Sequence, residues 1–362
     1  MRDLPCPGRR QSYQVLESPD GRYGRMVPQR MSEGKASSGP SKVTLKMVLD
    51  MTTPGAILLS SFMPALLGVI LAFEQTGHFP VLLCTCLVLI PSLMNASVDV
   101  LNDYFDYVNG NDTHENVVSE MDGPLAYHQI KNPKPAFYAG LGFMLLSAAL
   151  GIYVVLRCGT EVLVIGVTGA IIALTYSGFS KASSRLPVGE ILSGLTLGGL
   201  VPCGVYLALT GSLHPVVLFK SVPMMLIVSQ FMLSNNSCDL ERDKAAGRVT
   251  LPILIGRERA GKIAGIGLVI WIAVIILVIC RWYLLGLPWM VFWFFRARDA
   301  IREMLRLLGQ VEHGKGVLVC EMTHENKIPA TAMLAKIAFS VALGYPSAIL
   351  IHVLAEYIMN LA

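Results

Sequence analysis

The chain has little charge for its length. Only 15% of its 362 residues are Asp, Glu, Lys or Arg, whereas soluble domains carry about 25%. Hydrophobic residues make up 53% and fall in long runs. This composition excludes an ordinary soluble globule and indicates a protein that crosses a membrane several times. The net charge of +4 is modest, so the expected surroundings are a lipid bilayer, and we expect no nucleic-acid partner.

The sequence also lacks any cysteine spacing that would bind a metal or form a disulfide framework. The eight Cys residues are scattered, and most lie inside apolar runs. No pair has the spacing of a zinc site, so we expect small buried side chains.

Apolar segments of about 20 residues are long enough to cross a bilayer as helices. We predict an all-α bundle of nine transmembrane helices within a domain at 46–362, with spans at 54–73, 80–101, 136–156, 161–179, 188–209, 215–236, 263–283, 287–308 and 332–358. The eighth span is the weakest, because several arginines enter its second half, which favours an amphipathic helix at the interface.

The basic residues are distributed asymmetrically. Of the 29 Lys and Arg residues, only Arg157, Lys220 and Arg281 lie outside the polar segment 1–45 and the loops and helix ends after every second span. The positive-inside rule therefore places the N-terminus and the long loops on the cytoplasmic face. We expect a multi-pass protein of the cell inner membrane, with residues 1–45 as a disordered cytoplasmic tail.

Two clusters of amides and carboxylates follow apolar spans, and both are predicted to lie on the cytoplasmic face. In each cluster two polar side chains are spaced one helical turn apart, which brings them onto one helix face. Carboxylates at the end of a membrane helix are costly and mark a functional site. Facing pairs would form the hard-oxygen site that Mg²⁺ prefers. The first cluster contains Asn102, Asp103, Asp106 and Asp112, and the second Asn235, Asn236, Asp239 and Asp243.

These motifs resemble those of the UbiA superfamily of intramembrane prenyltransferases. The run Asn102-Asp-Tyr-Phe-Asp106 and the doubled Asn235-Asn236 are most similar to the 1,4-dihydroxy-2-naphthoate, or menaquinone, branch. A third element, Tyr176-Ser-Gly-Phe-Ser-Lys181 followed by Gly189-Glu190, resembles that branch's pattern between its fourth and fifth helices.

The resemblance implies Mg²⁺-dependent transfer of a polyprenyl group from a polyprenyl diphosphate to an aromatic acceptor, 1,4-dihydroxy-2-naphthoate in menaquinone biosynthesis. It implies that Asn102, Asp106, Asp239 and Asp243 hold the metal, with Asp103 and Asp112 supporting the metals or ordering the loop. The groups that it assigns to the diphosphate are Tyr176, Lys181, Arg248, Lys244, Asn235 and Asn236.

The sequence departs from the branch pattern at three places. Cys238 stands where the branch has Arg, and Lys244 or Arg242 is a candidate substitute. Asp99 stands where the branch has Asn, and Thr53 precedes the proline that usually follows a basic residue. These departures leave the acceptor open.

Other functions remain compatible with parts of this pattern. A superfamily member that uses 4-hydroxybenzoate, haem, chlorophyll or a glycerol-phosphate ether lipid as acceptor would need the same metal ligands. A cation-coupled transporter would also use carboxylates in membrane helices, but such sites lie near the midplane rather than at helix ends. The isoprenoid chain length and the oligomeric state are not indicated.

Overall fold

The computed structural model describes residues 11–15, 26–30, 42–115, 117, 120, 122–176, 187–245, 247–308, 310–311, 318–319 and 327–361. The chain divides into two compact units, Met1–Ser41 and Lys42–Ala362. In the first unit β1 (Gln11–Val15) and β2 (Met26–Arg30) pair antiparallel, with Gln11 opposite Arg30. Disorder of the tail as a whole stays a prediction.

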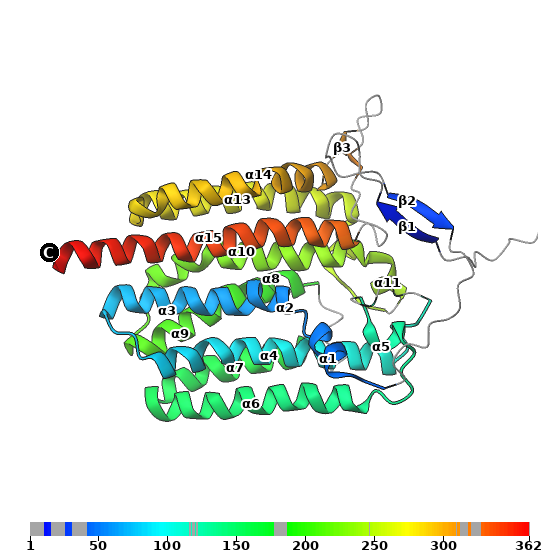
Figure 1. Ribbon diagram of the computed structural model, residues 1–362, viewed down its shortest axis with the longest axis horizontal. Helices are drawn as coiled ribbons and strands as arrows, with labels where there is room; N and C mark the ends of the chain where they lie inside the picture. The colour runs from blue at the N-terminus through cyan, green and yellow to red at the C-terminus, as the bar shows by residue number, and fades with distance from the viewer. Residues whose placement is uncertain are drawn as a thin grey trace, which may run out of the picture. The chain divides into compact units, whose positions relative to one another are not determined.

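The second unit is built almost wholly from helices in its described part (Figure 1). Its one strand pair is β3 (Gln310–Val311) with β4 (Leu318–Val319). The α-helices are α1 (Leu45–Met51), α2 (Pro54–Ile57), α3 (Met63–Thr76), α4 (Val81–Val108), α5 (Pro124–Tyr127), α6 (Lys134–Cys158), α7 (Thr160–Tyr176), α8 (Gly189–Ser193), α9 (Val201–Thr210), α10 (Pro215–Cys238), α11 (Leu240–Ala245), α12 (Leu251–Ile255), α13 (Arg257–Trp282), α14 (Leu287–Leu308) and α15 (Lys327–Leu361). Two π-helical segments, η1 (Leu58–Phe62) and η3 (Gly194–Leu200), and the short η4 (Leu284–Gly286) continue or connect them.

Seven helical segments in the described residues are long and apolar enough to cross a membrane. They are Pro54–Thr76, Val81–Val108, Lys134–Cys158, Gly189–Thr210, Pro215–Cys238, Arg257–Trp282 and Phe339–Asn360. The all-helical membrane bundle is therefore confirmed, and seven of the nine predicted spans with it. The fourth predicted span, 161–179, forms α7 over 17 residues, and its last three residues lie outside the described part of the chain. The eighth forms α14, whose arginines keep it below the hydropathy of a membrane helix.

Both polar clusters lie at the same end of the bundle. The helix α4 continues past residue 101, the predicted end of its span, to Val108, and so carries Asn102 and Asp106. The helix α10 ends at Cys238, directly before Asp239. Figure 1 shows α5 and α11 together at the end of the bundle that these two helix termini reach. The arrangement brings the two sequence motifs close enough to form one site.

The opposite end of the bundle is held together by an ion pair between a buried lysine and a partly exposed glutamate. Lys220, near the start of α10, places Nζ 3.1 and 3.0 Å from the two carboxylate oxygens of Glu74 on α3. The Tyr283 hydroxyl donates to Glu74 Oε2 at 2.8 Å, and the Tyr345 hydroxyl donates to the Lys220 carbonyl at 2.6 Å. A charge in an apolar bundle is tolerated when it is paired and hydrogen-bonded, so this cluster ties α3, α10, the junction between α13 and η4, and α15 together.

Close helix packing in the bundle depends on glycine. A Cβ on Gly198 in η3 would lie 2.3 Å from the Met225 backbone nitrogen in α10. Small residues allow this approach in membrane bundles, where close contact rather than water exclusion holds helices together. The packing of η3 against α10 matters for the site, because α10 carries the second polar cluster.

We expect Gly198→Ala to destabilise the protein by about 1–3 kcal/mol, because the added methyl group meets backbone that cannot move away. The measurement is thermal unfolding of the purified protein in detergent. Gly142→Ala on α6 is the matched control, because nothing lies within 4 Å of the added Cβ there. Equal melting temperatures of the two variants would contradict this account of the packing.

Candidate active site

Arg248 connects the two polar clusters. Its Nη2 lies 2.6 and 2.5 Å from the two carboxylate oxygens of Asp106, and its Nη1 lies 3.2 Å from Asp243 Oδ1. Gly247 adopts φ +73°, a conformation that favours glycine, and reverses the chain after α11. The Arg248 amide then donates to the Asp243 carbonyl at 2.9 Å. This turn places the guanidinium between carboxylates that lie far apart in the sequence.

Arg242 makes a second set of ion pairs beside the first. Its Nη2 lies 3.1 Å from Asp239 Oδ2. Its Nη1 lies 3.2 Å from Asp122 Oδ2 and 3.7 Å from Asp112 Oδ1. The long loop after α4 is thereby attached to the start of α11.

The first turn of that loop folds back onto Asp106. The Asn111 side chain donates to Asp106 Oδ1 at 2.9 Å. The backbone amides of Asn111 and Asp112 donate to the Asp106 carbonyl at 2.9 and 3.1 Å, and Gly110 takes φ +74°. The reversal buries Asp112 beside the cluster.

Glu190, the second residue of α8, is hydrogen-bonded to the second polar cluster through Asn236. It is 3% exposed. Its Oε1 accepts hydrogen bonds from Asn236 Nδ2 at 2.8 Å and from the Leu251 amide at 3.1 Å. A single buried carboxylate therefore fixes the end of α10 and the start of α12.

The site has an excess of negative charge. Burial raises the pKa of Asp112 to about 6, and the nearby Arg242 opposes that rise. Burial likewise raises the pKa of Asp243 to about 6, against the opposing effect of Arg248. The two guanidiniums pair with Asp106, Asp112, Asp122, Asp239 and Asp243. Asp103 adds a further carboxylate close to Asp106, Asp112 and Asp122.

The donor chemistry of the site suits a hard divalent cation. Carboxylate and amide oxygens are the ligands that Mg²⁺ prefers, and the unbalanced negative charge favours a cation. Among the described residues, however, no group of three or more His, Cys, Asp or Glu side chains is placed to hold a metal. The arginines stand between the carboxylates instead.

The remaining predicted site residues differ in position. Asn102 and Asp103 are half-buried near the end of α4, and Asn235 offers its carbonyl to the Asp239 amide at 3.0 Å. Lys244 is exposed. Tyr176 is the last residue of α7, and the placement of its side chain lies outside the described residues, as does Lys181.

Sequence reasoning left several site residues without a role. Asp122 and Asn111 are not among the predicted site residues, because nothing local shows that the loop folds back. Arg242 was a candidate only as a substitute for the arginine that Cys238 replaces. Its spacing of three residues from Asp239 was a usable signal, since such residues share a helix face.

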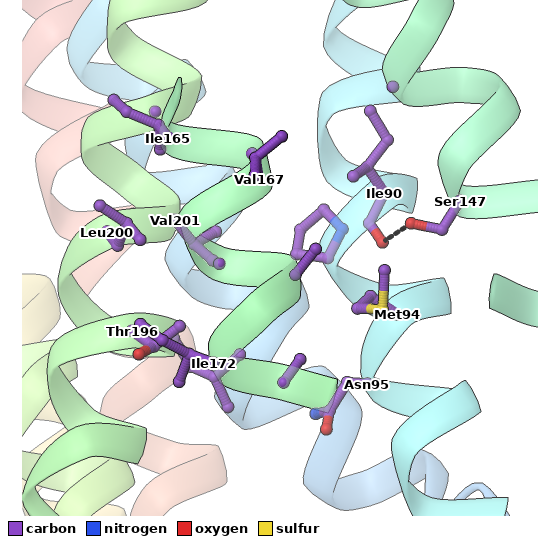
Figure 2. Close-up of a pocket in the computed structure, with 18 of the residues that line it drawn as sticks. Ile90, Met94, Asn95, Ser147, Ile165, Val167, Ile172, Thr196, Leu200 and Val201 are labelled. Carbon is purple, nitrogen blue, oxygen red and sulfur yellow. Dashed lines mark hydrogen bonds between the residues drawn. The ribbon is translucent and has the colours of Figure 1, made fainter. Parts of the chain in front are cut away.

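An apolar cavity of about 660 Å³ adjoins the polar site. Figure 2 shows its walls, with Ile90, Met94 and Asn95 of α4 on one side and Ile172, Thr196, Leu200 and Val201 on the other. The Ser147 hydroxyl of α6 donates to the Ile90 carbonyl at 2.9 Å and fixes one wall (Figure 2). The cavity lies between α4, α6, α7 and the η3–α9 segment.

One face of α4 joins the cavity to the charged cluster. Pro91, Asn95 and Asp99 line the cavity at intervals of four residues. Asn102 and Asp106 continue the same face over the next two turns, because residues three and four apart share a helix face. A ligand with an apolar tail and a charged head would therefore find both environments along one helix.

The family model of the UbiA prenyltransferase family matches residues 61–303. The chain belongs to this family. The resemblance seen in the motifs is thereby confirmed, and the enzyme class, a prenyltransferase, is confirmed with it.

Individual relatives agree with this assignment. The chain is 29% identical over 233 residues to the 1,4-dihydroxy-2-naphthoate octaprenyltransferase of Bacillus subtilis, which covers 63% of this chain and 72% of the relative. It is 28% identical over 204 residues to the UbiA prenyltransferase domain-containing protein 1 of Homo sapiens, covering 54% of this chain and 57% of that one. A solved UbiA homologue from Archaeoglobus fulgidus shares the fold, with a TM-score of 0.52 and 18% identity. The match covers 82% of this chain and 99% of the homologue.

We expect Arg248→Gln to lower stability in the absence of divalent cations, because it leaves Asp106 and Asp243 without their shared counter-charge. Loss of one partner of a fully buried pair costs about 3–5 kcal/mol. Arg248 is 28% exposed, so we expect about 1–3 kcal/mol, since solvent screens a partly exposed pair. The measurement is thermal unfolding in detergent with EDTA. Arg302→Gln, at a side chain 78% exposed, is the control, and equal melting temperatures would contradict the bridging role.

Proposed function

We propose that this protein transfers a prenyl group from a prenyl diphosphate to an aromatic acceptor, in a reaction that requires Mg²⁺. The observation that carries the proposal is the continuous face of α4. Asn95 and Asp99 line the apolar cavity, and Asp106 lies in the charged cluster two turns further on. A prenyl diphosphate has the matching two-part chemistry, with an apolar chain and an anionic head.

The diphosphate head is assigned to the cluster. Arg248 and Arg242 supply cations, and Tyr176, Lys181, Lys244, Asn235 and Asn236 remain the further candidates. Bound Mg²⁺ would supply positive charge that stabilises the departing diphosphate. The residues assigned to hold it are Asn102, Asp106, Asp239 and Asp243, with Asp103 and Asp112 beside them.

The cavity is assigned to the isoprenoid chain and the reacting carbon. Loss of diphosphate from an allylic prenyl group leaves a carbocation, which water would trap. The walls consist mainly of Leu, Ile, Val and Met side chains. Such apolar walls would exclude water when the substrate is bound, which prevents side reactions of reactive intermediates. The cation would then be attacked by the electron-rich carbon of the acceptor.

The first candidate acceptor is 1,4-dihydroxy-2-naphthoate, as in menaquinone biosynthesis. Its support is the similarity to the Bacillus subtilis enzyme of that name and the doubled Asn235-Asn236. A cation-coupled transporter is the weaker reading, because the carboxylates lie at helix ends rather than at the bilayer midplane. The concentration of Lys and Arg on one side of the predicted spans supports an active site on the cytoplasmic face of the cell inner membrane.

We expect Asp106→Asn and Asp239→Asn each to lower prenyl transfer by at least about 100-fold, because each removes charge from the site that stabilises the leaving group. The measurement uses purified protein in detergent with Mg²⁺ and radiolabelled geranylgeranyl diphosphate. Asp299→Asn, at a side chain 76% exposed on α14, is the control. Full activity of either site variant would overturn the metal assignment.

The acceptor is tested in the same assay. We expect transfer to 1,4-dihydroxy-2-naphthoate that is lost on addition of EDTA. Transfer only to 4-hydroxybenzoate or another acceptor would agree with the proposed metal site and would assign the protein to a different branch of the family. If the protein binds or hydrolyses the radiolabelled geranylgeranyl diphosphate but transfers the prenyl group to none of the acceptors, the proposed prenyl transfer is refuted.

A further inference from the structure

Asp99 occupies an unusual position for a carboxylate. It lines the apolar cavity, and no other Asp, Glu, Lys, Arg or His lies among the cavity-lining residues that the structure describes. Along α4 it comes after the apolar wall and before Asn102, so it stands at the end of the cavity that faces the charged cluster. No arginine or lysine in the described chain pairs with it, in contrast to Asp106 and Asp239.

One oxygen of Asp99 is held in place by Thr53. The Thr53 hydroxyl donates to Asp99 Oδ2 at 2.7 Å. Thr53 lies between α1 and α2 with φ 43° and ψ 64°, a left-handed conformation that a β-branched residue rarely adopts. Its amide donates to the Asp50 carbonyl, and its own carbonyl accepts from Ala56 and Ile57. The backbone is thus anchored on both sides, with the hydroxyl directed at Asp99.

The second oxygen of Asp99, Oδ1, accepts no hydrogen bond from the described residues. A carboxylate in apolar surroundings gains greatly from a further hydrogen-bond donor. The diphosphate, with its several negative charges, would be repelled there and directed to the arginines of the cluster. A ring that carries a hydroxyl fits this place, because its face suits the apolar wall and its O–H can donate to Oδ1 while a ring carboxylate is directed away from Asp99.

We propose that Asp99 binds a ring hydroxyl of the aromatic acceptor and takes its proton during prenyl transfer. This role rests on the proposed function and goes beyond it, because it names the group that recognises the acceptor. Asp99 and Asp106 are seven residues apart, which is about 10 Å along the helix at 1.5 Å per residue. That separation leaves room for a ring between the carboxylate and the carbon that leaves the diphosphate.

The C–O bond between the prenyl carbon and the diphosphate breaks, and its electron pair leaves with the diphosphate. The hydroxyl proton moves to Asp99, and the ring carbon forms the new C–C bond to the prenyl carbon as the ring oxygen becomes a carbonyl. The attacked carbon then loses a proton to the released diphosphate, or loses carbon dioxide. The bonding pair returns to the ring, and Asp99 returns its proton to the oxygen.

The test compares wild type, Asp99→Asn and Thr53→Val in detergent with Mg²⁺, geranylgeranyl diphosphate and 1,4-dihydroxy-2-naphthoate. General-base removal typically costs 10²–10⁴-fold. We expect Asp99→Asn to lower kcat/KM for the acceptor by about that factor, with KM for the diphosphate and the Mg²⁺ dependence unchanged. We expect Thr53→Val to lower kcat/KM for the acceptor by a smaller factor. Thr53→Ser should keep the wild-type value, because serine also carries a hydroxyl. The exposed Asp299→Asn is again the control.

The two mono-O-methyl ethers of the acceptor provide a test that needs no variant. We expect the wild type to prenylate one of the ethers far more slowly than the parent compound. We expect Asp99→Asn to prenylate that ether and the parent compound at equal rates. Equal rates of the wild type on both ethers and the parent would overturn the proposal. A shift in Mg²⁺ dependence on Asp99→Asn would overturn it in favour of a metal ligand. Failure of the wild type to prenylate any aromatic acceptor would instead refute the proposed function.

Discussion

The guanidinium of Arg248 between Asp106 and Asp243 is the interaction on which the polar site depends. Buried carboxylates from α4, the following loop and the α10–α11 corner repel one another and could not gather without positive charge between them. Arg248 and Arg242 provide that charge at distances of 2.5–3.7 Å. Because carboxylates still outnumber guanidiniums, the site retains an attraction for further cations. The same excess that threatens its stability therefore suits it to Mg²⁺.

The helix α4 sets the distances of the proposed reaction. Its middle turns line the apolar cavity, its next turn carries Asp99, and its last turns carry Asn102 and Asp106. A rigid helix fixes these groups at intervals of 1.5 Å per residue, whereas a loop would leave their spacing variable. Three environments of different polarity thus follow one another along a single element, in the order that an apolar chain, an aromatic ring and a diphosphate would require.

Local pattern predicted the helices and the two motifs well, because both follow from short-range periodicity. The spacing of Asn102 and Asp106 predicted a shared helix face, and α4 confirms it by running to Val108. Long-range contacts were beyond that reasoning. The ion pair of Arg242 with Asp122 joins residues 120 positions apart, and Glu190 meets Asn236 across 46. Seven of the nine predicted spans meet the length and hydropathy of a membrane helix within the described residues. The other two fall on α7, beyond which the described residues stop, and on α14, into which several arginines enter.

A contrast between two carboxylates shows how hydrogen bonding separates structural acids from functional ones. Glu74 lies at the far end of the bundle, and both of its oxygens are engaged, by Lys220 and by the Tyr283 hydroxyl. Its charge is compensated within the fold, so it acts as a tie between helices. Asp99 receives one donor from within the described fold and faces a cavity. A carboxylate that folding leaves half-satisfied beside an apolar volume is one whose second partner comes with the ligand.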